Sequence, residues 1–201
     1  GIVVFPLTSG ELAGHFAQGG QKRWSAYLAG ERLGRAAATI PDIGGDPVIS
    51  GGRVYAANVS GETAALSLAT GEAIWRAGEG AAGPLWLAGG SLFFVNDLGQ
   101  LVRLDAGSGR PVWRQQLPLF PERRGLFSGR GARGRYVHQG PLIASGRLIL
   151  ASSDGVMRQF DPRNGAPVGE VALPGGAASN PVVAGGTLYV VSGDGELLAF
   201  R

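Results

Sequence analysis

The chain of 201 residues contains no cysteine and a single methionine, and only 16% of its residues are charged. Without cysteine there is no disulfide, no thiolate metal ligand and no cysteine nucleophile. Every apolar run is shorter than the ~18 to 20 residues that a membrane-spanning helix needs. The formal net charge is only +3. These absences exclude disulfide-stabilised scaffolds, cysteine enzymes and membrane-spanning helices.

Glycine and proline are abundant instead, with 36 and 12 residues. Such a share of structure-breaking residues approaches the range of low-complexity disorder. The chain is nevertheless 44% hydrophobic with a mean hydropathy of +0.10, which is too apolar for a chain that stays uncollapsed. Many short apolar segments joined by tight turns satisfy both observations, and this predicts an all-β fold.

A repeat runs through the whole sequence. Each of five frames begins at a glycine before a short apolar run, and a second glycine follows nine residues later. Four frames have a third glycine after ten more residues, and three of these have a tryptophan four residues further on. The frames begin at Gly1, Gly52, Gly90, Gly146 and Gly186; the tryptophans are Trp24, Trp75 and Trp113, with Gly169 in the fourth frame.

Each frame reads as short strands joined by hairpin turns. Runs such as 54–57 and 92–95 are β-prone, and the turn glycines accept the positive φ of tight hairpins. A further short run precedes most frames and begins with proline, which is tolerated at a strand's first residue. The unit is a four-stranded antiparallel sheet of about 40 residues, the size of a β-propeller blade. The tryptophans are expected to pack one blade against the next.

The predicted blades cover approximately residues 1–29, 46–78, 83–117, 140–174 and 180–201, with inserts at about 30–45 and 118–139. Three blades are complete, the first lacks one strand, and the last lacks its closing strand. Residues 1–201 are therefore interpreted as a partial PQQ-like β-propeller, about half of a ring. Loops on such a rigid scaffold commonly carry function, so the inserts are the candidate sites.

Two segments, 65–75 (ALSLATGEAIW) and 104–113 (LDAGSGRPVW), resemble repeats of the PQQ-like propellers. The chain also resembles the C-terminal half of the BamB family, lipoproteins of the outer-membrane β-barrel assembly machinery (the BAM complex). Segments 41–49, 52–57, 140–142 and 195–201 carry this second resemblance.

The resemblance implies an eight-bladed ring at the periplasmic face of the outer membrane of a Gram-negative bacterium. The membrane contact would be an N-terminal lipid that lies outside this chain. The implied role is a non-catalytic scaffold without cofactor or metal, and the implied partner is BamA through its periplasmic domains.

The first insert is the expected partner-binding site. In the family the loop holding the position of Asp42 lies at the BamA contact face, and Gly44 stands where some members carry a second acidic residue. The candidate residues combine both charges with an apolar side chain that looks exposed, a mixture that suits a protein-binding rim. They are Arg32, Arg35, Asp42, Ile43 and Asp46. The alternative is an irregular capped loop.

The second insert is rich in arginine, with five between Arg123 and Arg135. Its segment 129–134 is formally a G-x-G-x-x-G, but a dinucleotide site requires a helix after it, and a strand is predicted there. The cluster is compatible with an anionic partner surface or with a solvated loop. No aromatic stacking series accompanies it, so nucleic acid is not expected.

Catalytic and metal-binding patterns are missing. Four aspartates sit in or beside repeat turns, where this residue bonds its own backbone. They are Asp97, Asp154, Asp161 and Asp194. His15 and His138 share no metal-ligand spacing. We therefore expect no enzyme activity. The repeat leaves two alternatives, a PQQ-dependent quinoprotein dehydrogenase and a ligand-sensing propeller domain of another envelope protein.

Half of a ring exposes two apolar blade faces, which a monomer rarely tolerates. The sequence therefore predicts that the chain associates as a dimer. Gly1 leads directly into a strand-like segment with no initiator methionine or signal-peptide pattern, so we also expect the chain to begin inside a longer precursor.

Overall fold

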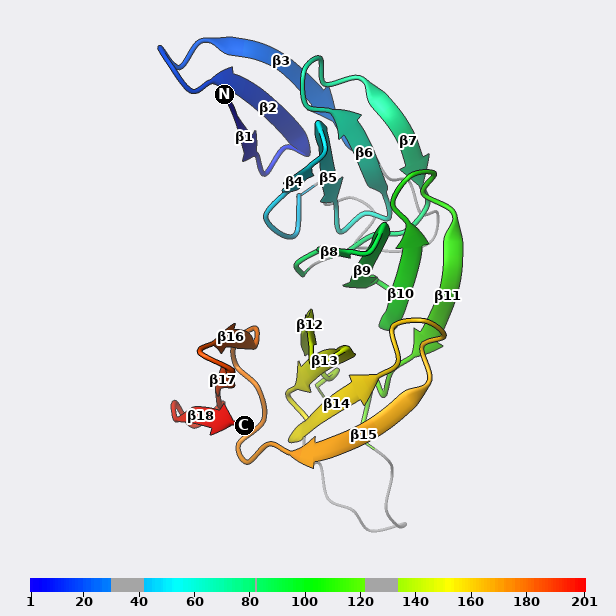
Figure 1. Ribbon diagram of the computed structural model, residues 1–201, viewed down its shortest axis with the longest axis vertical. Coiled ribbons are helices and arrows are strands. Elements are labelled where there is room, and N and C mark those ends of the chain that lie inside the picture. The colour runs from blue at the N-terminus through cyan, green and yellow to red at the C-terminus, as the bar shows by residue number, and fades with distance from the viewer. Residues whose placement is uncertain (30–41, 82, 122–133) are drawn as a thin grey trace. The chain divides into compact units, whose positions relative to one another are not determined.

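The computed structural model describes residues 1–29, 42–81, 83–121 and 134–201. Regular structure in these ranges consists of eighteen strands, which form five sheets (Figure 1). Among the described residues there is no helix long and apolar enough to cross a membrane. The chain divides into two compact units, Gly1–Leu98 with Val102–Arg114, and Gly99–Leu101 with Gln115–Arg201. The predicted all-β fold of repeated antiparallel sheets is confirmed.

The first unit contains sheet 1, sheet 2 and most of sheet 3, each with its strands in sequence order. Sheet 1 consists of β1 (Ile2–Pro6), β2 (Glu11–Phe16) and β3 (Lys22–Tyr27). Sheet 2 consists of β4 (Val48–Ser50), β5 (Arg53–Ala57), β6 (Thr63–Ser67) and β7 (Ala73–Ala77). Sheet 3 consists of β8 (Trp86–Ala88), β9 (Ser91–Val95), β10 (Gln100–Asp105) and β11 (Pro111–Gln116).

Glycines of the frame make the tight turns between the first two strands of a sheet. Gly51 and Gly52 join β4 to β5 with φ values of 56° and 75°, a region that glycine enters without a Cβ clash. In the fourth frame Ser145 takes the first of these positions with φ 48°. Glycine is therefore frequent here because the repeat needs many left-handed turn residues.

Sheet 2 is buried on both faces, which explains why residues 54–57 of β5 and 64–66 of β6 are apolar. Along β5, Val54 and Ala56 pack with Leu12 of sheet 1 in one core cluster. Tyr55 and Ala57 point to the other face and join the cluster that includes sheet 3. Successive side chains of a strand point to opposite faces, so each residue of β5 has a neighbouring sheet to contact.

Trp24 on β3 packs against sheet 2 and joins sheet 1 to it. Its indole Nε1 donates a hydrogen bond to the Leu68 carbonyl at 2.8 Å. The ring also covers Gly71, where an added Cβ would lie 2.7 Å from the Trp24 Cε3 atom. Only glycine leaves room for this approach, so the tryptophan and the third frame glycine act together.

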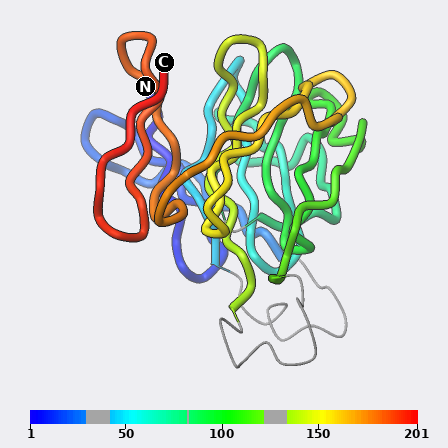
Figure 2. Tube along the Cα trace, turned by 90° about the horizontal axis from the view of Figure 1, so that it is seen from below, coloured from blue at the N-terminus to red at the C-terminus, as the bar shows by residue number. Residues whose placement is uncertain are grey.

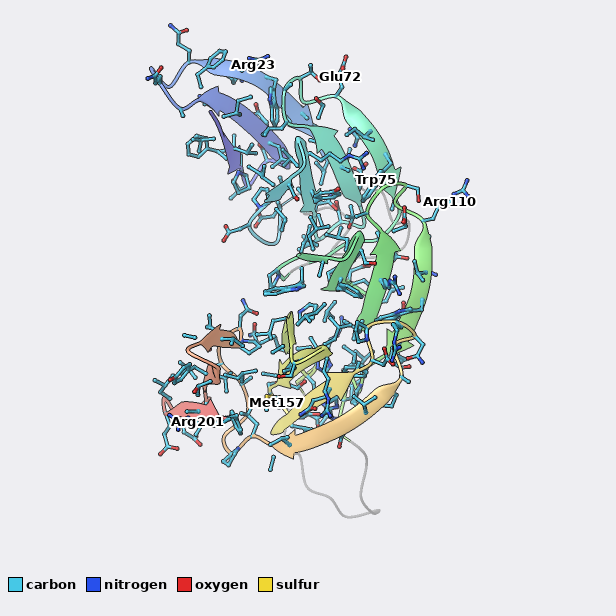
Figure 3. All side chains as sticks on the ribbon, in the orientation of Figure 1. Arg23, Glu72, Trp75, Arg110, Met157 and Arg201 are labelled. Atoms are coloured by element: carbon cyan, nitrogen blue, oxygen red, sulfur yellow. The ribbon has the colours of Figure 1, made fainter. Side chains whose placement is uncertain are left out.

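Trp75 on β7 repeats the same contact with sheet 3. Its Nε1 donates to the Ala106 carbonyl at 3.0 Å, and a Cβ at Gly109 would lie 2.5 Å from its Cε3 atom. Figure 3 labels Trp75 and, near it, Arg110, the residue after Gly109. The predicted role of these two tryptophans in packing sheet against sheet is confirmed.

The second unit contains sheets 4 and 5. Sheet 4 consists of β12 (His138–Ala144), β13 (Arg147–Ser152), β14 (Val156–Phe160) and β15 (Pro167–Ala172). Sheet 5 consists of β16 (Val182–Ala184), β17 (Thr187–Val191) and β18 (Leu197–Phe200), an up-and-down meander in orange and red in Figure 2.

The packing between sheets 4 and 5 uses other side chains. Gly169 on β15 stands at the frame position that holds tryptophan elsewhere. Met157 on β14, labelled in Figure 3, packs with Leu142 and Leu188 in a core cluster that Phe200 also touches. Flexible and aromatic apolar side chains thus replace the indole contact between these two sheets.

Candidate partner-binding site

The turn between β5 and β6, residues 58–62, binds the residues just before the first insert. We call it the first anchor turn. Asn58 is fully buried, and its Oδ1 accepts the N–H groups of Gly61 and Glu62 at 3.0 and 2.8 Å. Its Nδ2 donates to the Leu28 carbonyl at 3.1 Å. One amide side chain therefore closes the turn and ties it to the chain that follows β3.

Glu62 adds a charged contact to this turn. Its Oε2 accepts the N–H of Ala29 at 2.6 Å, and Arg76 Nη1 lies 2.5 Å from its Oε1. The same arginine donates to the Tyr27 carbonyl at 3.2 Å. The carboxylate side chain is only 10% exposed, so its partners supply the hydrogen bonds that burial removes.

The described end of the first insert returns to the same turn. The N–H of Val59 donates to the Asp42 carbonyl at 3.0 Å, and Ile43 forms an isolated antiparallel bridge with Asn58. The N–H of Gly44 donates to the Ala57 carbonyl at 3.2 Å. The chain on either side of residues 30–41 is thus fixed to one anchor turn.

This backbone course positions two carboxylates, Asp42 and Asp46. Asp42 is half-buried and Asp46 is exposed. Between them Gly45 approaches the chain before β8 so closely that a Cβ there would lie 2.7 Å from the Gly83 carbonyl oxygen. Segment 42–46 therefore has a constrained backbone and presents acidic groups at both of its ends.

The predicted site residues have different outcomes. Asp42, Ile43 and Asp46 lie together on segment 42–46, whereas Arg32, Arg35 and most of the arginine-rich insert lie outside the described residues. The expectation that Ile43 is exposed was wrong. Its side chain is 8% exposed and packs with Leu28 and Val54. The bridge to Asn58 turns it into the core, so it anchors the segment and leaves the surface to the aspartates.

Asn58 and Glu62 were not among the predicted residues. A signal for Asn58 was present, because the residue six positions after the frame glycine is Asn58, Asn96, Ser152 or Ser192 in four of the five frames. A polar residue at a fixed repeat position predicts a repeated hydrogen bond. Glu62 has a similar signal, because Glu11, Gln100 and Glu196 stand at its position, ten residues after the frame glycine, in three other frames. Its partners Arg76 and the backbone of Ala29 could not be predicted from this spacing.

The turn between β13 and β14 plays the same part for the second insert. We call residues 152–154 the second anchor turn. His138 contacts Ser152 Oγ through Nδ1 at 2.7 Å and the Pro118 carbonyl through Nε2 at 2.8 Å. A carbonyl only accepts, so Nε2 carries the proton and Nδ1 accepts from the serine. Val137 donates its N–H to Ser153 Oγ at 2.9 Å.

Burial lowers the pKa of His138, and the nearby positive charges of Arg158 and Arg135 lower this pKa further. The Pro118 carbonyl and Asp154 oppose the shift. The neutral ring is therefore favoured in the folded chain. Ser152 is fully buried, so this His–Ser pair is a structural hydrogen bond and no substrate can reach the hydroxyl.

In the part of the chain that the structure covers, no group of three or more His, Cys, Asp or Glu residues could hold a metal ion. Asp161 accepts the N–H of Arg163 at 2.8 Å, in agreement with the turn role predicted for it. What the geometry provides is a set of anchored loops on stacked sheets, an arrangement suited to binding a macromolecule.

Stacked four-stranded antiparallel sheets with a glycine and tryptophan frame define the class, a β-propeller of PQQ-like repeats. A family model described as outer membrane protein assembly factor BamB matches residues 1–115 and 99–201, and the chain belongs to this family.

Known relatives agree with this assignment. The chain is 26% identical over 196 residues to the outer membrane protein assembly factor BamB of Legionella pneumophila, covering 98% of this chain and 47% of that protein. The crystal structure of BamB from Moraxella catarrhalis matches with a TM-score of 0.72 and 22% identity, covering 99% of this chain and 57% of that one. The chain spans about half the length of the curated relative.

The fold extends to enzymes. The quinohemoprotein alcohol dehydrogenase of Comamonas testosteroni matches with a TM-score of 0.71 and 12% identity, covering all of this chain and 40% of that one. At this identity the likeness concerns the fold alone.

Proposed function

We propose that the chain is part of a non-catalytic scaffold of the outer-membrane β-barrel assembly machinery, at the periplasmic face of the outer membrane. Its proposed partner is BamA, bound through the periplasmic domains. Membership of the BamB family supports the general role, and the geometry of segment 42–46 supports the contact.

The observation that carries the proposal is the fixed backbone of this segment. The first anchor turn holds Asp42 through the N–H of Val59, and the buried side chain of Ile43 fastens the segment to the core. The fixed backbone of segment 42–46 lowers the entropy lost on binding, because this segment is already ordered. Asp42 and Asp46 then offer negative charge to basic groups of a partner. Arg32 and Arg35 remain proposed contacts of the same site.

The test is the affinity of the purified chain for the periplasmic domains of BamA, measured by calorimetry. Reversing both charges, Asp42→Arg with Asp46→Arg, is expected to weaken binding at least about tenfold. The control is Asp194→Arg, an exposed aspartate on the turn between β17 and β18, which is expected to change the affinity less than about twofold. Unchanged affinity of the double variant would rule out segment 42–46 as the binding site. Absence of binding by the wild-type chain would rule out BamA as the partner.

A quinoprotein dehydrogenase is the second candidate because such enzymes share these sheets. It predicts a quinone absorbance band in the protein purified with pyrroloquinoline quinone and Ca²⁺, and dye-linked oxidation of alcohols. We expect neither.

A further inference from the structure

One buried position of the repeat changes from an apolar to a charged residue. It lies four residues after the frame position that holds tryptophan in three frames. Its occupants in four frames are Leu28, Glu79, Leu117 and Leu173, and all four are 0–5% exposed. Because leucine fills the position three times, burial there requires only an apolar side chain. The carboxylate of the remaining frame must therefore be explained by what it binds.

The carboxylate of Glu79 joins two elements of sheet 3. Its Oε1 accepts hydrogen bonds from Arg114 Nε and Nη2 at 2.8 and 2.5 Å. Its Oε2 accepts a hydrogen bond from Asn96 Nδ2 at 2.8 Å. Between sheets 1 and 2, the equivalent amide of Asn58 binds the backbone carbonyl of Leu28. The charged side chain thus takes over a contact that the backbone makes at the other junction.

Stability alone does not explain this buried ion pair. A buried carboxylate loses its hydration, and replacing a buried ion pair by apolar side chains is often neutral or stabilising. Hydrogen bonds to a carboxylate are directional, however, so donors on both of its oxygens fix the position of the group. They also fix the backbone that carries it. Glu79 therefore has the chemistry of a residue that positions a segment.

The segment that Glu79 carries is the beginning of the connection between β7 and β8. The N–H of Ala81 donates to the Asn58 carbonyl of the first anchor turn at 2.9 Å. The N–H of Asp97, in the turn between β9 and β10, donates to the Gly80 carbonyl at 3.0 Å. Backbone hydrogen bonds therefore join this connection both to the first anchor turn and to sheet 3.

Further along, the same connection contacts the candidate partner-binding site. A Cβ on Gly45 would lie 2.7 Å from the Gly83 carbonyl oxygen and 3.3 Å from the Cα atom of Pro84. Segment 42–46 thus packs directly on the backbone of the connection. Because this contact leaves no free space, a shift of the connection would also move the segment.

We propose that Glu79 is a positioning residue of the partner-binding site. Its carboxylate, held by Arg114 and Asn96, fixes the connection between β7 and β8. The connection in turn sets where segment 42–46 presents its two aspartates to BamA. This inference rests on the proposed function, which supplies the partner, and it adds a residue that acts on the site through the backbone.

The first test is the affinity for the periplasmic domains of BamA, measured by calorimetry at a temperature where every variant is folded. Glu79→Leu introduces the residue of the other frames, and we expect binding to weaken at least about fivefold because the connection loses two anchors. Glu79→Gln keeps one acceptor oxygen, and we expect a loss of only about twofold.

The matched control is Leu173→Ala, which truncates the side chain at the same repeat position in sheet 4. The cavity is expected to lower the Tm by at least about 5 °C, more than Glu79→Leu does. The affinity for BamA should nevertheless stay unchanged, because Leu173 has no connection to segment 42–46. An equal loss of affinity in both variants would assign the effect of Glu79→Leu to general stability and would overturn the proposal.

The second test needs no partner. The N–H of Gly44 donates to the Ala57 carbonyl, so its hydrogen exchange reports on how well segment 42–46 is held. Glu79→Leu is expected to speed this exchange at least about fivefold, and Leu173→Ala is expected to leave it unchanged. Unchanged exchange together with wild-type affinity in Glu79→Leu would overturn the proposal. If the wild-type chain does not bind BamA, the proposed function fails, and the exchange of Gly44 alone decides whether Glu79 positions the segment.

Discussion

The two anchor turns hold two inserts at the same place in the repeat, but with different chemistry. The first uses a buried amide and an ion pair, Asn58 and Glu62 with Arg76. The second uses a neutral pair, His138 with Ser152. The comparison shows that the repeat determines where an insert is attached. The individual side chains determine how much the attachment stabilises the fold and how this stabilisation depends on salt and pH.

The largest expected difference between the two turns is the stability contributed by the side-chain amide of Asn58. Asn58→Ala leaves the Leu28 carbonyl and two N–H groups of a buried turn without partners, so we expect a loss of about 2–4 kcal/mol of unfolding free energy. Ser152→Ala removes one hydrogen bond and is expected to cost about 1 kcal/mol. Denaturant unfolding measures both losses, and equal losses would mean that the two side chains contribute equally to stability.

The next difference is how closely the backbone of each insert packs against neighbouring atoms. Gly45→Ala places a Cβ against the Gly83 carbonyl, and we expect a loss of about 1–3 kcal/mol with weaker BamA binding, because segment 42–46 must move. Gly134 lies in the second insert, and no described atom lies within 4 Å of a Cβ built there. Gly134→Ala is therefore expected to be neutral in both measurements. A neutral Gly45→Ala would show that segment 42–46 is not constrained.

The ion pair is expected to contribute less. Glu62→Gln keeps an oxygen for the Ala29 N–H but removes the charge that faces Arg76. The arginine side chain is 44% exposed, so solvent screening limits the expected loss to about 1 kcal/mol. The loss should shrink in 1 M salt. A loss independent of salt would assign the effect of Glu62 to hydrogen bonding alone.

The smallest effect is the pH response of the second turn. Burial holds the pKa of His138 below its ordinary value of 6.5, so the unfolded chain takes up the proton first as pH falls. Stability is therefore complete above about pH 6.5, declines below it, and becomes level again below the folded pKa. His138→Gln should remove this step from a series of unfolding curves. A step that survives in the variant would exclude His138 as its origin.

Much of the fold followed from spacing alone. The frame glycines and Trp24 and Trp75 predicted the sheets and their packing, because tight turns and close ring contacts need particular residues at fixed intervals. The site was less predictable. Ile43 looked exposed because its neighbours are glycine and aspartate, and only the bridge to Asn58 turns it inward. Glu62 acts on residues 14 and 33 positions away, beyond the reach of local pattern.

The most direct test of the proposed function is hydrogen exchange of the chain with and without the periplasmic domains of BamA. The account predicts that BamA slows exchange in segment 42–46 and leaves the turn at 193–196 unchanged. Slower exchange at 193–196 with no change in segment 42–46 would contradict it.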